Sequence, residues 1–274
     1  MLNLFSYPIR PHLIILMNSK PYRYERLPVL EKKPLRQHIV VLSGAGISVE
    51  SGLATFRGAD ESLWNKFDWK RLASVGGFYE DPEAVLEFYN ERRKQLLTVE
   101  PNHAHKLLSA LEQWHDVTII TQNIDNLHER AGSSHVLHLH GELTKVTSSD
   151  NRNNPECIKE LPLDIPIKLG DKAADGSQLR PHIVWFGEFV TEYQNAAEII
   201  KTADIFVVIG TSLTVTPASE LIRYPHKSVP KFVIDPNIIS YPYDDGYMSQ
   251  FEYISQSASS GLECFIDRLL ELQY

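Results

Sequence analysis

Cysteine is scarce in this chain: among 274 residues only Cys157 and Cys264 occur. This count excludes a disulfide framework and favours a reducing compartment. No apolar run reaches the roughly 18 residues that a membrane-spanning helix needs. Basic residues are outnumbered by acidic ones, 27 to 35, so the formal net charge is −8. We therefore expect a cytoplasmic protein that binds neither nucleic acid nor a membrane.

The first 36 residues lack the periodicity of the rest of the chain. Residues 1–36 contain many prolines and basic side chains, and we expect them to form a peripheral or poorly ordered arm. A weak targeting peptide is one alternative. The other is an over-extended start, with Met17 as the true initiator.

Beyond this arm, apolar runs alternate with helical patterns. Each run is nearly continuously apolar, as strands buried on both faces of a parallel sheet should be. The alternation predicts an α/β fold, a Rossmann-type doubly wound parallel sheet over residues 37–272. The expected strands are His38–Ser43, Val117–Thr121, Asp204–Ile209 and Lys231–Ile234, and the expected helices between and after them are Pro101–Trp114, Asn195–Ala203 and Leu262–Leu272.

Irregular sequence and polar clusters complete this organisation. Residues 143–180 interrupt the alternation with prolines, asparagines and glycines, and we expect them to form part of a smaller inserted subdomain. Each expected strand ends in a cluster of Gly, Asn or Asp. Because ligands bind beyond the carboxyl ends of the strands in such sheets, the clusters predict one shared site.

A glycine-rich loop, Gly44-Ala45-Gly46, follows the first strand directly. Glycines there let the backbone approach a phosphate, and the amino end of a following helix favours negative charge. These three residues alone are equally consistent with a tight structural turn. The motif continues, however, through Ser48 to Phe56-Arg57-Gly58.

This longer loop and four further motifs together resemble the sirtuin family over about residues 37–272, in the family's order and spacing. The resemblance implies an NAD-binding domain with a smaller inserted module. It also implies an NAD-dependent protein-lysine deacylase that consumes NAD and yields free lysine, nicotinamide and O-acyl-ADP-ribose. Acylated-lysine proteins or peptides would then be its partners. The four motifs are Thr121-Gln122-Asn123-Ile124-Asp125, His138-Leu139-His140-Gly141-Glu142, Val184-Trp185-Phe186-Gly187-Glu188 and Gly210-Thr211-Ser212.

By this resemblance His140 is the general base, and histidine has the intrinsic pKa that such a base needs near neutral pH. Asn123 and Asp125 complete the catalytic set, with the asparagine near the ribose and the aspartate on the nicotinamide side. We expect a structural role for His138. The implied NAD contacts are Gly44, Ala45, Gly46, Ser48, Phe56, Arg57, Gln122, Asn123, Ile124, Asp125, Gly210, Thr211, Ser212, Asp235, Asn237 and Ala258. The implied substrate contacts are Val184, Phe186, Gly187 and Glu188, with backbone hydrogen bonds from the last two to an extended peptide.

The segment Pro82–Leu97 indicates which acyl group the enzyme prefers to remove from lysine. Val85, Tyr89, Arg92 and Leu96 follow helical spacing and share one face. An arginine in this apolar seam either snorkels at its edge or binds an anionic ligand, for which its guanidinium suits a carboxylate. The Tyr89-x-x-Arg92 pair and Ala59 are similar to class III sirtuins, which prefer malonyl, succinyl and glutaryl lysine. We therefore expect succinyl or malonyl lysine to be a better substrate than acetyl lysine.

The sequence departs from most sirtuins in its zinc ligands. They carry two C-x-x-C pairs between the H-G-E and F-G-E motifs, whereas this chain has only Cys157 there. A makeshift site from Cys157, His182 and carboxylates is the alternative to our expectation that no zinc is bound. Without zinc, a small apolar cluster must hold the inserted module, for which the candidates are Ile158, Leu161, Leu163, Ile165, Ile167 and Leu169.

Three other functions fit parts of the pattern. Mono-ADP-ribosyl transfer would use the same NAD site. A non-catalytic NAD- or ADP-ribose-binding module would not need His140. A hydride-transferring dehydrogenase is disfavoured because the first loop lacks G-x-G-x-x-G spacing.

Overall fold

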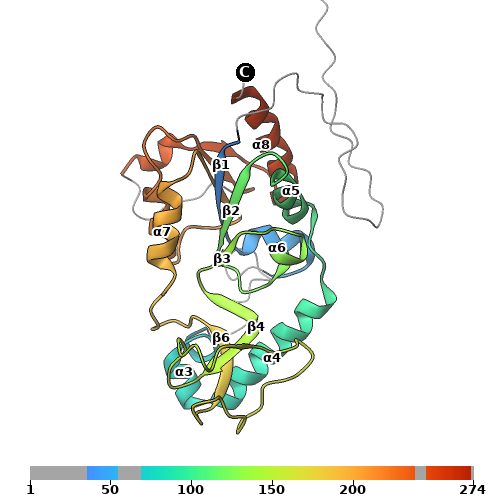
Figure 1. Ribbon diagram of the computed structural model, residues 1–274, viewed down its shortest axis with the longest axis vertical. Coiled ribbons are helices and arrows are strands. Elements are labelled where there is room, and N and C mark those ends of the chain that lie inside the picture. Colours follow the sequence, from blue (N-terminus) through green and yellow to red (C-terminus); the bar gives the residue numbers. More distant parts are fainter. Residues whose placement is uncertain (1–35, 55–68, 238–244, 273–274) are drawn as a thin grey trace, which may run out of the picture.

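A six-stranded parallel sheet forms the larger lobe of the computed structural model, which describes residues 36–54, 69–237 and 245–272 (Figure 1). Its strand order is β3-β2-β1-β7-β8-β9, and every pair is parallel. The strands are β1 (His38–Ser43), β2 (Asp116–Thr121), β3 (Val136–His138), β7 (Ile205–Ile209), β8 (Lys231–Ile234) and β9 (Glu252–Ile254). The expected doubly wound Rossmann-like fold is confirmed.

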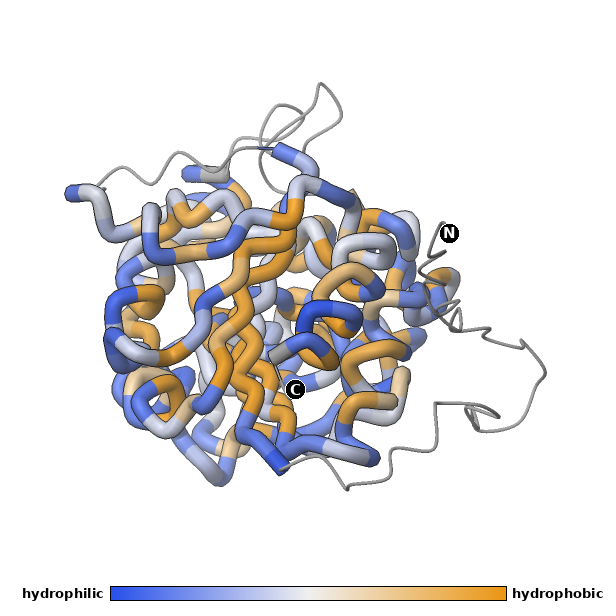
Figure 2. Tube along the Cα trace, turned by 90° about the horizontal axis from the view of Figure 1, so that it is seen from above, coloured by the Kyte–Doolittle hydropathy of each residue, from blue (hydrophilic) through white to orange (hydrophobic). Residues whose placement is uncertain are grey.

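Helices cover both faces of this sheet, because alternate residues of each strand point to opposite sides. In β1, Ile39 and Val41 join an apolar cluster with helices α5 (His103–Leu111) and α8 (Ala258–Leu272). Val40 and Leu42 join a second cluster on the other face, with α7 (Tyr193–Lys201) and the 3-10 helix η2 (Ala218–Arg223). Figure 2 shows the apolar strands between these two layers.

The smaller lobe pairs an antiparallel sheet with three helices. The sheet has the order β5-β4-β6 and contains β4 (Gly141–Ser148), β5 (Lys159–Glu160) and β6 (Leu179–Ile183). Its helices are α2 (Trp69–Leu72), α3 (Val75–Glu80) and α4 (Pro82–Thr98). Residues of α4 pack with β4 and β6 in one apolar cluster, so this lobe combines the predicted insertion with a segment that precedes it in the chain.

Three short helical turns connect these elements. The 3-10 helix η1 (Ala45–Ser51) follows β1, α6 (Leu127–Arg130) follows the loop after β2, and the 3-10 helix η3 (Tyr247–Gln250) precedes β9. No helix in the described part of the chain is long and apolar enough to cross a membrane.

A fully buried arginine organises the smaller lobe. Arg93 on α4 has 0% exposure. Its guanidinium donates hydrogen bonds to the backbone carbonyls of Leu143, Leu161 (3.0 Å), Pro162 (2.7 Å) and Ile165 (3.3 Å). Arg93 therefore ties β4 and the irregular chain after β5 to α4, a role that sequence analysis missed.

The predicted apolar cluster of the insertion is only partly correct. Ile167 is buried, and Leu161 and Leu163 pack against the core. Ile165 and Leu169, in contrast, are 46% and 56% exposed. Hydrogen bonds from Arg93 to its backbone carbonyls position this part of the chain, and its apolar side chains do not alternate regularly. Ile165 and Leu169 therefore face solvent.

Charged side chains are buried together at a second point of this lobe. The Arg180 guanidinium pairs with the Glu188 carboxylate at 2.7 Å and lies 3.2 Å from the centre of the Trp185 ring. Arg152 lies 3.6 Å from the same carboxylate. Both cysteines are free, and no group of three or more potential metal ligands occurs among residues 36–54, 69–237 and 245–272. The absence of zinc stays a prediction.

Candidate functional site

The loops after β1, β2 and β7 meet at one edge of the sheet, as the shared direction of parallel strands requires. The amide of Gly46 donates to the Gly210 carbonyl at 2.7 Å. The Gln122 side chain donates to the Thr211 hydroxyl at 3.0 Å. The sequence motifs predicted for one site are therefore brought together here.

Two glycines are required by this meeting of loops. A Cβ on Gly46 would lie 2.6 Å from the Gly210 Cα atom. Gly210 has φ +61°, and a Cβ there would lie 2.4 Å from the Ile47 nitrogen. The glycine-rich loop thus serves first to let two backbone segments touch, and the helix that follows it is the short η1.

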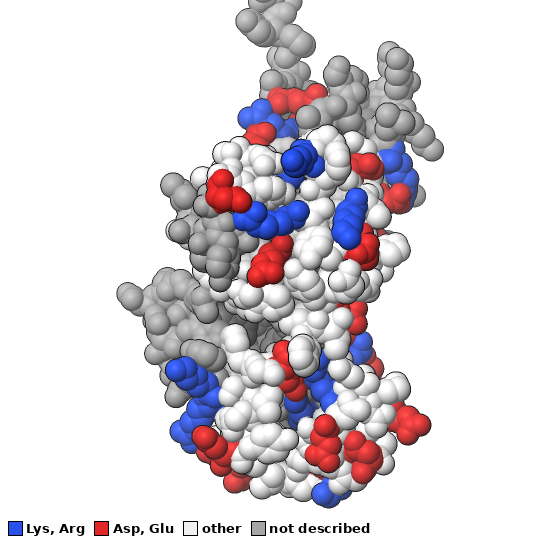
Figure 3. Space-filling model, turned by 90° about the vertical axis from the view of Figure 1, so that its left-hand side faces the viewer, with Lys and Arg blue, Asp and Glu red and all other residues white. Residues whose placement is uncertain are grey.

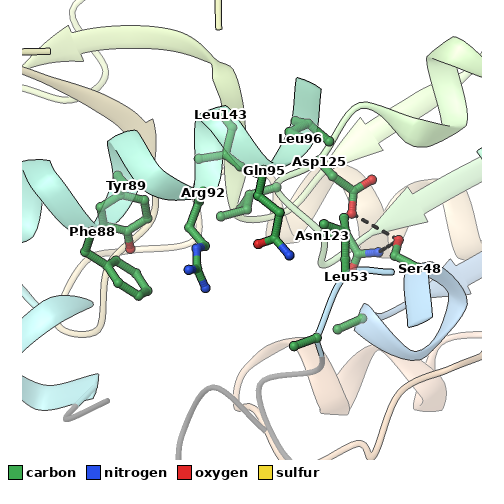
Figure 4. Close-up of a pocket in the computed structure, with 13 residues that line it drawn as sticks. Ser48, Leu53, Phe88, Tyr89, Arg92, Gln95, Leu96, Asn123, Asp125 and Leu143 are labelled. Carbon is green, nitrogen blue, oxygen red and sulfur yellow. Dashed lines mark hydrogen bonds between the residues drawn. The ribbon is translucent and has the colours of Figure 1, made fainter. Parts of the chain in front are cut away.

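A pocket lies where this edge faces the smaller lobe. Figure 3 shows the molecule narrowing between its two lobes, with basic and acidic side chains interspersed on that face. Figure 4 shows side chains of α4 on one side of the pocket and polar side chains of the larger lobe on the other. The lining residues are Ala45, Ser48, Leu53, Ala54, Phe88, Tyr89, Arg92, Gln95, Leu96, Asn123, Ile124, Asp125 and Leu143.

Three buried polar side chains form a chain of hydrogen bonds on the sheet side of the pocket (Figure 4). The Asn123 amide donates to the Ser48 hydroxyl at 3.2 Å, and that hydroxyl donates to the Asp125 carboxylate at 3.1 Å. Burial raises the pKa of Asp125, against the opposing effect of hydrogen bonds from the Leu127 amide and Ser48. Ser48 therefore fixes the two predicted catalytic side chains relative to each other.

His140 lies in the turn directly before β4, and one of its ring nitrogens is engaged in a hydrogen bond. Its Nδ1 lies 2.9 Å from the Gln122 carbonyl oxygen. Because that oxygen only accepts, Nδ1 carries a proton and Nε2 keeps its lone pair in the neutral ring. Burial lowers the pKa of His140, and the Gln122 carbonyl offsets this only in part. The ring is thus held as a base that stays neutral at physiological pH.

Arg92 and Tyr89 lie on the α4 side of the pocket, with Arg92 between Tyr89 and Gln95 (Figure 4). The Arg92 side chain is 20% exposed, and its guanidinium lies 5.2 Å from the Phe88 ring centre. Burial lowers the Arg92 pKa, partly opposed by Glu91. Tyr89 is 3% exposed, and burial raises its pKa far above the usual value, so its hydroxyl stays protonated.

The remaining predicted cofactor contacts in the described residues follow β7 and β8 or begin α8. Thr211 is buried, whereas Ser212 is exposed and its hydroxyl lies 2.8 Å from that of Thr214. Asp235 directly follows β8 and accepts from the Asn237 amide at 2.9 Å. Ala258 is the first residue of α8 and is buried. Phe56, Arg57 and Ala59 lie outside the described residues.

The predicted substrate segment runs beside the smaller lobe. The Val184 amide donates to the His140 carbonyl at 2.9 Å, and the Phe186 amide donates to Ala73 at 2.9 Å. The Glu188 amide donates to the Trp185 carbonyl at 3.0 Å, so only its carbonyl is left for the predicted backbone contact to a peptide. This bond closes a turn in which Gly187 has φ +97°, and the peptide contacts of both residues stay predictions.

Five residues of the pocket wall were not predicted from the sequence: Leu53, Ala54, Phe88, Gln95 and Leu143. Gln95 follows Arg92 by three residues, so helical spacing already places the two on one face. Helical spacing alone therefore places both Gln95 and Phe88 beside Arg92. Leu53, Ala54 and Leu143 reach the pocket through tertiary contacts, which no local pattern signals.

Comparisons with known proteins agree with this arrangement. Residues 44–217 match the model of the Sir2 family. An NAD-dependent protein deacylase of Bacteroides thetaiotaomicron is 52% identical over 228 residues, which cover 83% of this chain and 95% of the relative. One from Helicobacter pylori is 45% identical over 237 residues, 86% and 99% of the two chains. A solved Sir2 homologue–NAD complex superposes with a TM-score of 0.72 at 33% identity, covering 86% and 91%.

Proposed function

Because the chain belongs to the Sir2 family and is an NAD-dependent protein deacylase, we propose that it removes succinyl and malonyl groups from lysine in preference to acetyl. The observation that carries this proposal is the placement of Arg92 and Tyr89 in the same pocket as Asn123 and Asp125. A cation and a hydroxyl donor at that end of a largely apolar pocket suit an acyl chain that ends in a carboxylate.

The residues of the site fit NAD by their chemistry. When bound, NAD supplies the ribose carbon to which the acyl oxygen is transferred as nicotinamide departs. Backbone of the Gly44–Gly46 and Gly210–Ser212 loops lies at the sheet edge where a dinucleotide's phosphates bind in Rossmann-type folds. The Asp125 carboxylate offers a buried negative charge, which suits the positively charged nicotinamide ring.

His140 is the proton acceptor in this proposal. Its Nδ1–H is fixed by the Gln122 carbonyl, so only Nε2 can take a proton from a ribose hydroxyl. Asn123, tied to Ser48, orients the ribose or a water molecule by its amide. No metal is needed for these roles, and we propose that the smaller lobe is held by Arg93 without zinc and that the enzyme works in the cytoplasm.

The acyl preference rests on the cost of burying an unpaired charge. A carboxylate that entered this pocket without a partner would lose its hydration, whereas one beside Arg92 regains charge-assisted hydrogen bonds of about 1.5–3 kcal/mol each. Such a bond corresponds to a rate or affinity factor of about 10 to 100. An acetyl group has no carboxylate to pair with Arg92, so Arg92 should favour only the acidic acyl substrates.

Matched peptides that differ only in the acyl group test this proposal. We expect the wild-type kcat/KM to be at least tenfold higher on succinyl or malonyl lysine than on acetyl lysine. In Arg92→Met this advantage should disappear while acetyl-lysine activity stays within about threefold. Lys94→Met is the matched control, since Lys94 is an exposed cation on the same helix. An unchanged succinyl preference in Arg92→Met would refute the proposal.

A further inference from the structure

The segment from the end of β3 into β4, residues 138–143, makes hydrogen bonds to three successive backbone carbonyls of the loop after β2. His140 Nδ1 lies 2.9 Å from the Gln122 oxygen, and His138 Nδ1 lies 3.0 Å from the Asn123 oxygen. The Leu143 amide donates to the Ile124 oxygen at 2.8 Å. The loop that carries Asn123 and Asp125 is therefore positioned from the β3–β4 segment, one peptide group after another.

His138 differs from His140 in the use of its second nitrogen. His138 Nε2 lies 2.7 Å from a carboxylate oxygen of Glu129 on α6. A peptide carbonyl and an ionised carboxylate both accept only. His138 satisfies both of them only when each ring nitrogen carries a proton, which makes the ring an imidazolium ion. His140 has one such partner and remains a base.

We propose that His138 is a positioning residue of the reaction, whose imidazolium ring, paired with Glu129, fixes the Asn123 peptide group and thereby the Asn123 and Asp125 side chains. This inference rests on the catalytic roles given above to Asn123 and Asp125. His138 touches neither substrate nor the reacting atoms; it acts through the loop. The His138 side chain is only 7% exposed, whereas that of Glu129 is 39% exposed, so solvent screens the pair from the carboxylate side.

The charges around His138 favour its protonated form. Burial alone would lower its pKa, but hydrogen bonding and attraction to Glu129, with further contributions from Glu142 and the Asn123 carbonyl, raise it overall. Burial opposes ionisation of Glu129, yet His138 holds the Glu129 pKa below its usual value, with help from Lys145.

Two other groups face His138. Asp125 lies close enough for the imidazolium to favour its carboxylate form, which burial disfavours. His128 on α6 is fully buried, and both burial and the charge of His138 lower its pKa. A single fixed positive charge beside the loop is therefore consistent with an ionised Asp125 and a neutral His128.

A pair of near-isosteric variants separates positioning from general stability. The amide nitrogen of His138→Asn lies near the place of imidazole Nδ1 and can still hold the Asn123 carbonyl. The amide of His138→Gln reaches toward Nε2 and Glu129 instead. Both variants lose the charge, so their thermal stabilities should fall alike, whereas only His138→Gln should lose the loop contact.

The readout is single-turnover release of nicotinamide with any acyl peptide that the wild type turns over. We expect His138→Asn to retain the maximal single-turnover rate within about threefold. His138→Gln should lose about tenfold or more in that rate, with the peptide concentration for half-maximal rate unchanged, because small displacements of catalytic groups cost up to about a hundredfold. Equal activity of the two variants, or a His138→Asn as impaired as His138→Leu, would overturn the inference.

NMR of the imidazole nitrogens tests the charge without any turnover. At pH 6.5 both His138 nitrogens of the wild type should be protonated, and Glu129→Gln should lower the titration midpoint by at least one pH unit. Glu100→Gln is the matched control, because it removes an exposed ion pair with Arg130 of the same helix. A single protonated nitrogen in the wild type would refute the imidazolium. Activity on acetyl but not succinyl peptides would refute the acyl preference. The comparison of His138→Asn with His138→Gln, and that of Glu129→Gln with Glu100→Gln, would still test the role of His138.

Discussion

Replacing Arg93 with methionine is expected to destabilise the smaller lobe strongly. Methionine has a similar length and no donor, so the carbonyls of Leu143, Leu161, Pro162 and Ile165 lose a buried cationic partner at once. Leaving a buried acceptor unsatisfied costs about 1–3 kcal/mol. Part of this is recovered by the apolar side chain, and we expect a loss of about 4 kcal/mol in the free energy of unfolding.

Urea denaturation and thermal melting measure this loss. For a chain of this size, 1 kcal/mol shifts Tm by about 2–4 °C, so Arg93→Met should lower Tm by about 10 °C. Lys94→Met, at the exposed neighbouring position, should change Tm by less than about 2 °C. A change below about 1 kcal/mol in Arg93→Met would show that the carbonyl contacts do not hold the lobe together.

Three further outcomes follow from the same structure. Because burial lowers the pKa of His140, the acid limb of kcat/KM should fall below pH 6.5; a midpoint above 7 would contradict the neutral-base assignment. Burial also lowers the pKa of His105 to about 4 and that of His128 well below 6.5. The stability that the two neutral histidines contribute is fully present above pH 6.5 and is lost as the pH falls from 6.5 toward 4. The midpoints of urea denaturation should therefore drop between pH 7.5 and 5, and an unchanged midpoint would refute this pH dependence. Elemental analysis should find less than about 0.1 zinc per chain, and EDTA should leave Tm unchanged; one tightly bound equivalent overturns the zinc-free interpretation.

The larger lobe was largely predictable from the sequence. Strands buried on both faces produce continuous apolar runs, and β1 and β8 begin and end where their runs do. The three-residue strands β3 and β9 are too short to leave such a pattern. Their pairing is imposed by neighbours in the sheet.

The smaller lobe was less predictable because distant residues determine it. Helical spacing places Arg92 on the pocket face of α4 and does not identify its neighbour Arg93 as buried. Arg93 is buried because carbonyls 50 to 72 positions away surround it. Likewise, the motif predicts His140 as the base, whereas the protonation state that we propose for His138 rests on its contacts with Glu129 and the Asn123 carbonyl.

In the reaction that we propose, an acidic acyl group moves from lysine to NAD-derived ADP-ribose. Mass spectrometry of a reaction containing NAD and a succinyl-lysine peptide tests it most directly. We predict O-succinyl-ADP-ribose, nicotinamide and free lysine peptide in equal amounts, and none of them with His140→Ala. ADP-ribosylated protein without O-succinyl-ADP-ribose, or NAD left intact beside an unchanged succinyl peptide, would contradict the account.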